Sequence, residues 1–159
     1  MGNYNEDSVR LFTEKYIASL PSTGKIVKPT DIGMNFAKGI VRNEFTRSMQ
    51  TPQSTALIVW EGKCPWTVKN SVIADMTGQI LTMIYLQEIR EDKGWAYSVS
   101  ADGQVGPSNT GLGDPQYLFE AYCPVKPENS EDAVNIMVKD LADIAKSGVQ
   151  EKYLSKVKE

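Results

Sequence analysis

The 159-residue chain contains no histidine. This absence excludes every Ser-His-Asp or Cys-His catalytic arrangement and every zinc site built on histidine. It also removes the side chain that most often moves protons near neutral pH. Cysteine is scarce as well, because Cys64 and Cys123 are too few for a disulfide framework or a four-cysteine zinc site. We expect two core thiols, with a single bridge between them as the alternative.

The chain also lacks a surplus of positive charge and any long apolar run. It has 17 Lys and Arg against 20 Asp and Glu, a formal net charge of −3, which argues against binding to nucleic acid. No apolar stretch approaches the roughly 20 residues that span a bilayer, so we expect no membrane partner. No signal peptide precedes the first expected helix, so an export signal would lie outside this sequence. With 41% apolar and 23% charged residues, the composition is that of one globular domain.

Hydrophobic periodicity and turn residues predict an α+β fold with a largely antiparallel sheet and helices packed on one face. Asn5 is the expected N-cap of the first helix, and the last helix is so short that the chain resembles a piece cut from a longer one. The expected elements are a helix over 5–19, a linker over 21–35, strands over 38–48 and 54–61, a helix over 66–92, strands over 95–105 and 116–123 joined by a loop over 106–115, and helices from 130 and from about 150.

Two elements carry more specific expectations. The strand over 54–61 (STALIVWE) is apolar at successive positions, so we place it centrally with both faces covered. The long helix over 66–92 contains Gly78 near its middle, which costs about 1 kcal/mol relative to alanine. A close contact between helix and sheet would explain that glycine.

The densest polar cluster is EIREDKGWAY at residues 88–97. Its simplest interpretation is a solvated helix end followed by a turn. A sharper one places Arg90 in the last helical turn and Tyr97 near the start of the next strand, with Gly94 reversing the chain so that the two side chains converge. A guanidinium and a phenol together suit recognition of a peptide carbonyl or a developing oxyanion, and they supply no nucleophile and no metal ligand.

Other candidate sites are weaker. Glu88, Glu91 and Asp92 are hard-cation ligands by type, but no calcium-loop spacing is present. The glycines at 103, 106, 111 and 113 do not follow a strand and open a helix, so a phosphate-binding loop is not expected. The three tryptophans, at 60, 66 and 95, are typical of a core or an interface.

The run LTMIYLQEIREDKGWAYSVSA (81–101) resembles the C-terminal repeat of insulinase/pitrilysin-like zinc metallopeptidases. GNYNEDSVRLFTEKYIASLP (2–21) resembles the helix that closes the preceding repeat, STALIVWEG (54–62) fits the strand before the long helix, and 127–159 resembles the pair of closing helices. The resemblance implies a half-repeat of the family's α/β roll. It divides the chain into a closing helix with its linker (1–35) and a truncated C-terminal domain (36–159).

The resemblance also implies a function. The family's zinc signature, His-x-x-Glu-His, is missing here, which implies that zinc lies in an N-terminal catalytic domain and that this segment binds no cofactor. Arg90 and Tyr97 match the family's Arg and Tyr seven residues apart, so Tyr97 is expected to help hold the scissile carbonyl oxygen and Arg90 to bind nearby peptide backbone. Trp95 departs from the smaller aliphatic residue common at its position.

The resulting hypothesis is a non-catalytic, substrate-clamping domain of a zinc-dependent endopeptidase, inactive alone. Its partners would be a peptide substrate and either the remaining domains of the same chain or a paired catalytic subunit, with no nucleic acid and no membrane. By resemblance, a bacterial cell-envelope protease is the favoured setting. The alternative is an inactive scaffold or partner-binding subunit of the same fold, and a third option is an unrelated α+β binding module.

Overall fold

The computed structural model describes residues 3–25, 30, 38–106 and 116–158. Helices and strands are mixed along the chain, with a pair of consecutive strands and a pair of consecutive helices toward its end. The elements are α1 (Glu6–Thr13), the π-helix η1 (Glu14–Ala18), β1 (Ser54–Lys63), α2 (Val68–Tyr85), the π-helix η2 (Leu86–Asp92), β2 (Ser100–Gly106), β3 (Gln116–Val125), the 3₁₀-helix η3 (Pro127–Asn129), α3 (Ser130–Ser147) and α4 (Glu151–Lys158).

The three strands form one antiparallel sheet in the order β1-β3-β2. The predicted hairpin between β2 and β3 is confirmed, with Ala101 opposite Ala121. The prediction that 54–61 is a central strand with both faces covered is wrong, because β1 is an edge strand of the described sheet. On its open face Leu57 and Val59 remain 57% and 46% exposed. An apolar run predicts that a strand prefers burial on both faces, but it does not specify what covers the second face.

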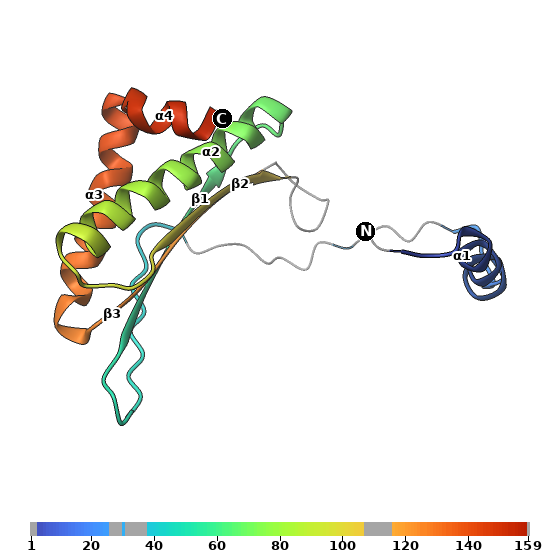
Figure 1. Ribbon diagram of the computed structural model, residues 1–159, viewed down its shortest axis with the longest axis horizontal. Coiled ribbons are helices and arrows are strands. Elements are labelled where there is room, and N and C mark those ends of the chain that lie inside the picture. Colours follow the sequence, from blue (N-terminus) through green and yellow to red (C-terminus); the bar gives the residue numbers. More distant parts are fainter. Residues whose placement is uncertain (1–2, 26–29, 31–37, 107–115, 159) are drawn as a thin grey trace.

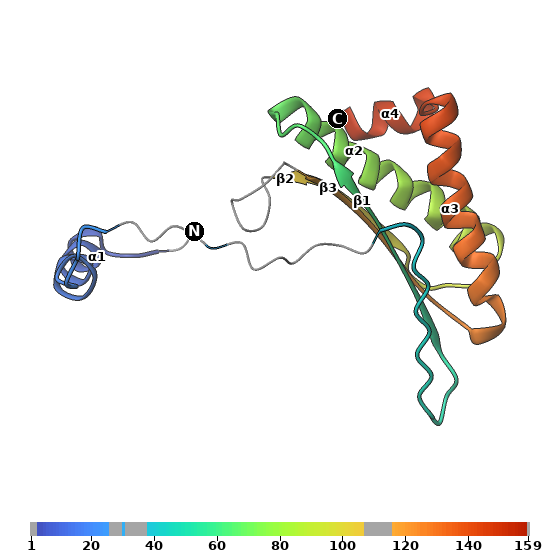
Figure 2. The same ribbon diagram turned by 180° about the vertical axis from the view of Figure 1, so that it is seen from behind.

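Helices α2, α3 and α4 all lie on one face of the sheet, and no described helix covers the other face (Figures 1 and 2). Along β1 and β3 the side chains point alternately to the covered face and to the open face, as the pleat of a strand requires. Side chains from both layers meet in one core, including Leu81, Tyr85, Ile89, Ala121 and Met137. The α+β class with helices on one face is therefore confirmed.

Close packing of α2 on β2 explains Gly78. A Cβ atom added at Gly78 would lie 2.7 Å from the backbone nitrogen of Gly103, and one added at Gly103 would collide with the carbonyl oxygen of Ala74. One turn further on, the Thr82 hydroxyl donates to the Ala101 carbonyl oxygen at 3.0 Å and accepts from the Ala101 N–H at 2.8 Å. This hydroxyl satisfies the backbone of an edge strand that would otherwise be unpaired at that position.

The strand predicted over 38–48 is wrong, because residues 40–49 form no helix or strand. In both views this segment runs beside the start of β1 as an extended chain (Figures 1 and 2). This segment forms an ion pair with the start of α3, where Arg42 Nη1 lies 3.5 Å from Glu131 Oε1. Ile40 is fully exposed and Phe45 is 93% exposed, so the segment lacks the packing that holds a strand in place.

The N-terminal helix forms as predicted over α1 and η1. The Asn5 side chain accepts a hydrogen bond from the Ser8 N–H at 2.8 Å, which confirms the N-cap. No residue of α1 or η1 is buried, and the helix stands apart from the sheet (Figure 1). Most of the predicted linker (26–29 and 31–37) and of the predicted loop (107–115) falls outside the described residues. Among the described helices, none is long and apolar enough to cross a membrane.

Candidate functional site

Arg90 and Tyr97 lie next to each other at the end of the long helix. The Arg90 guanidinium carbon is 5.5 Å from the centroid of the Tyr97 ring, within the range of a cation–π interaction. The Arg90 side chain is 46% exposed and Tyr97 is 87% exposed. The predicted convergence of the two side chains is therefore present, and both polar ends are open to a ligand.

The helix end that carries Arg90 is held by a modified C-terminal cap. Gly94 has φ of +64°, a left-handed conformation that glycine adopts without strain. Its N–H donates to the Arg90 carbonyl oxygen at 3.0 Å, and the Trp95 N–H donates to the Ile89 carbonyl oxygen at 3.0 Å. Both bonds span one residue more than in an ordinary Schellman cap because the last turn is π-helical. Such π segments are frequent at functional sites.

Buried neighbours hold both side chains in position. Ile89, which precedes Arg90, is fully buried, and Ala96 and Val99, on either side of Tyr97, are 9% and 4% exposed. Tyr97 itself was predicted within a strand over 95–105, but β2 begins only at Ser100. The backbone of 95–99 is instead a connection anchored by its apolar residues, which leaves Tyr97 pointing outward.

The surroundings of the pair are charged and solvated. Arg90 Nε lies 3.4 Å from Glu91 Oε1, and the Lys93 ammonium sits 4.6 Å from the centroid of the Trp95 ring. Exposed ion pairs of this kind contribute little to stability, so Arg90 is free to exchange Glu91 for another acceptor. Within the described ranges no group of three or more His, Cys, Asp or Glu side chains is placed to hold a metal ion.

One buried carboxyl group was missed by the sequence reasoning. Asp140 of α3 is 5% exposed, and its Oδ2 atom has no hydrogen-bond partner. Burial, together with the negative charge of Glu88 on η2, raises the pKa of Asp140 above its ordinary value, although Lys139 opposes the shift. A signal was present, since Asp140 follows Ala133 and Met137 at helical spacing on the buried side of α3.

Burial makes one of the two cysteines unreactive. Cys123 is buried in the core, where burial raises the pKa of its thiol to about 11, so the thiolate is disfavoured at neutral pH. Cys64 is half-buried, and both thiols are free. The prediction of two core thiols is confirmed for Cys123 and is wrong for Cys64, which lies outside the core cluster. The alternative of a single bridge is wrong as well.

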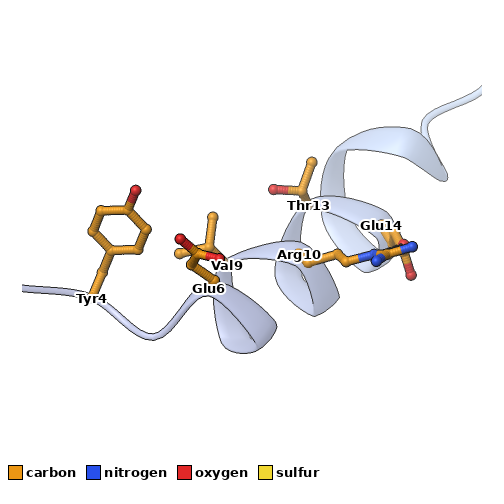
Figure 3. Close-up of a pocket in the computed structure, with 6 residues that line it drawn as sticks. All are labelled: Tyr4, Glu6, Val9, Arg10, Thr13 and Glu14. Carbon is orange, nitrogen blue, oxygen red and sulfur yellow. Dashed lines mark hydrogen bonds and ion pairs between the residues drawn. The ribbon is translucent and has the colours of Figure 1, made fainter.

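A shallow hollow lies along α1. It is lined by Tyr4, Glu6, Val9, Arg10, Thr13 and Glu14 (Figure 3). Arg10 Nε pairs with Glu14 Oε1 at 3.1 Å across one helical turn. All its lining residues come from one exposed helix and the chain leading into it, so it is a groove along a helix and not an enclosed pocket.

Fold and site together define an α+β domain with a three-stranded antiparallel sheet and an exposed guanidinium beside a phenol. The chain matches the family model of the peptidase M16 inactive domain over residues 1–159, and it therefore belongs to that family. The resemblance to the C-terminal domain of insulinase-like peptidases is thereby confirmed. No curated protein sequence matches the chain.

Proposed function

We propose that this domain clamps peptide substrate for a zinc-dependent endopeptidase whose zinc is held by another domain. The observation that supports this most directly is the exposed Arg90–Tyr97 pair, with the guanidinium 5.5 Å from the ring centroid. The Arg90 guanidinium offers several N–H donors to peptide carbonyl oxygens, and the Tyr97 hydroxyl offers one more to the oxyanion that forms during hydrolysis.

The contact between the two side chains serves this role. With the Tyr97 ring against its guanidinium, Arg90 is held in fewer rotamers before a peptide arrives, which lowers the entropic cost of binding. The positive charge beside the ring also favours a hydrogen bond from the phenol to a developing negative charge. Neither group can attack a peptide bond, so this domain alone hydrolyses nothing.

The remaining components lie elsewhere in the protein. We propose that zinc, which no described residues here could hold, belongs to an N-terminal catalytic domain or to a paired catalytic subunit. Residues 1–35 would close the preceding repeat and 36–159 would form the clamping domain. The separation of α1 from the sheet supports this division (Figure 2).

The decisive experiment is Tyr97→Phe in the full protein, with peptide hydrolysis as the readout. Loss of one oxyanion donor should lower kcat by about 10- to 1000-fold while folding stays unchanged, because the hydroxyl is exposed. Tyr4→Phe is the matched control, since Tyr4 is also an exposed tyrosine, 65% accessible, but lies on the chain leading into α1. Its kcat should stay at the wild-type value.

The alternative function is a scaffold or partner-binding subunit of the same fold. The uncovered apolar residues of the sheet and of α1 favour it, since large exposed apolar areas mark interfaces. An unchanged kcat in the Tyr97→Phe protein, or a full protein with no zinc-dependent hydrolysis at all, would support the scaffold and reject the clamp.

A further inference from the structure

A second cation lies against an aromatic ring beside the Arg90–Tyr97 pair. The Lys93 ammonium is 4.6 Å from the centroid of the Trp95 ring, as the Arg90 guanidinium is 5.5 Å from that of Tyr97. The two cations are three residues apart at the end of η2, and the two rings are two residues apart in the connection that follows. One helix end and its turn therefore carry two pairs of a cation and a ring.

The two carboxylates between Arg90 and Lys93 have partners of their own. Glu91 Oε1 lies 3.4 Å from Arg90 Nε, and Asp92 Oδ1 accepts a hydrogen bond from the Gln87 side chain at 2.8 Å. Among the described residues no carboxylate lies within ion-pair distance of Lys93. Lys93 is thus the cation of this turn that contacts a ring and not an acid, and its ammonium retains N–H donors for a ligand.

The Trp95 ring holds the ammonium in place. Trp95 is half-buried and packs against the core, whereas Lys93 is exposed. An indole face is the best aromatic partner for a cation, and a lysine held against it loses fewer rotamers when a ligand binds. A lysine at a helix end also complements the helix dipole. That structural role alone would change the stability of the fold and not the choice of ligand, so the two roles can be separated.

We infer that Lys93, held by Trp95, selects peptides with an acidic side chain close to the bond held by the Arg90–Tyr97 pair. This inference rests on the clamp proposed above and adds a substrate preference to it. An extended peptide advances about 3.4 Å per residue, so a side chain one or two residues from the clamped carbonyl comes within reach of the long lysine side chain. Its carboxylate would give the ammonium the counter-charge that a ring does not supply.

The test is hydrolysis, by the full protein, of blocked peptides that share one sequence. A single glutamate is placed at successive positions on either side of the cleaved bond, and each peptide is paired with one that has glutamine there. At one position kcat/KM should be about threefold higher for glutamate at low salt, the range of an exposed ion pair. The preference should shrink near 0.5 M salt, where the Debye length is only about 4 Å. Equal kcat/KM within every pair would overturn the inference.

Lys93→Met locates the effect. Methionine keeps an unbranched apolar stem beside Trp95 but carries no charge, so the ratio of kcat/KM for glutamate to that for glutamine should fall to about one, while Tm shifts by less than about 2 °C. Lys152→Met is the matched control, because the Lys152 ammonium also lies 4.6 Å from a ring centroid, that of Tyr153, but on α4. It should keep the wild-type preference. A preference that survives Lys93→Met, or that Lys152→Met removes equally, rejects Lys93 as the selecting group.

The outcomes separate this inference from the clamp itself. If Tyr97→Phe slows hydrolysis but the wild-type protein shows no preference for glutamate, the selection by Lys93 is rejected and the clamp stands. If Tyr97→Phe leaves kcat unchanged, the clamp is rejected and the inference that rests on it is rejected as well.

Discussion

At the scale of single residues, the least satisfied group in the core is the Asp140 carboxyl. It lies between η2 and α3 with Glu88, Lys139, Asp143 and Tyr85 as its ionisable neighbours. Burial is the main reason that its pKa is raised in the folded chain, and the charge of Glu88 acts in the same direction. The folded state therefore holds the Asp140 proton more tightly than the unfolded state does.

This difference sets the sign of a pH effect on stability. Above the raised pKa the folded chain carries the full penalty of the buried charge, and below the unfolded value of about 3.9 the penalty is gone. Asp140→Asn should therefore raise the free energy of unfolding by about 1 kcal/mol at pH 7 and by little near pH 4. Urea denaturation at the two pH values measures the difference.

Asp143→Asn is the control for Asp140. Asp143 is 61% exposed and pairs with Lys139 at 3.0 Å, so neutralising it removes no buried charge. Asp143→Asn should therefore not raise the free energy of unfolding at neutral pH. A destabilised Asp140→Asn protein at both pH values would show that the carboxylate is satisfied by a group outside the described residues.

At the scale of elements, the closest approach in the fold is that of α2 to β2 at Gly78 and Gly103. Gly78→Ala improves helix propensity by about 1 kcal/mol. It also places a methyl group 2.7 Å from the Gly103 nitrogen and 3.0 Å from the Asp102 Cα, and both are backbone atoms that cannot rotate away. The cost of overpacking should exceed the gain in helix propensity. The free energy of unfolding, measured by chemical denaturation, should therefore fall by about 1–3 kcal/mol.

Gly106→Ala is the matched control for this contact. A Cβ atom at Gly106 meets no heavy atom within 4 Å, and its φ is not in the left-handed region. Stability should therefore change by less than about 0.5 kcal/mol, as for other surface substitutions. If Gly78→Ala proved as stable as this control, the helix would have to sit further from the sheet than it does here.

Elements were predictable where one physical signal dominated. The Asn5 cap, the long helix ended by Gly94 and the β2–β3 hairpin follow from capping, periodicity and turn residues, and all three are present. The strand over 38–48 was mispredicted because strand propensity alone does not hold a strand in place, and Ile40 and Phe45 have almost no packing around them. The approach of Arg90 to Tyr97 was predictable from the Gly94 turn, whereas the widened π-helical cap and the burial of Asp140 depend on tertiary packing.

At the scale of the whole molecule, the chain consists of a packed body and a helix that takes no part in its core. Residues of α1 and η1 are all exposed, including the large apolar side chains of Phe12, Tyr16 and Ile17. In contrast, α4 packs against α2, with Tyr153, Leu154 and Val157 half-buried. Removing α1 should therefore leave the stability of the body nearly unchanged, whereas removing α4 should lower it.

Deletion of residues 1–35 should shift Tm by less than about 2 °C, because the residues of α1 and η1 bury nothing against the sheet. It should also reduce self-association in light scattering, since an exposed apolar stripe is removed. Deletion of residues 149–159 should instead lower Tm by several degrees, because about 2 kcal/mol of apolar burial on α2 is lost. Were the first deletion to destabilise the chain as strongly as the second, α1 would have to pack on the body in solution, and the proposed boundary at residue 35 would be wrong.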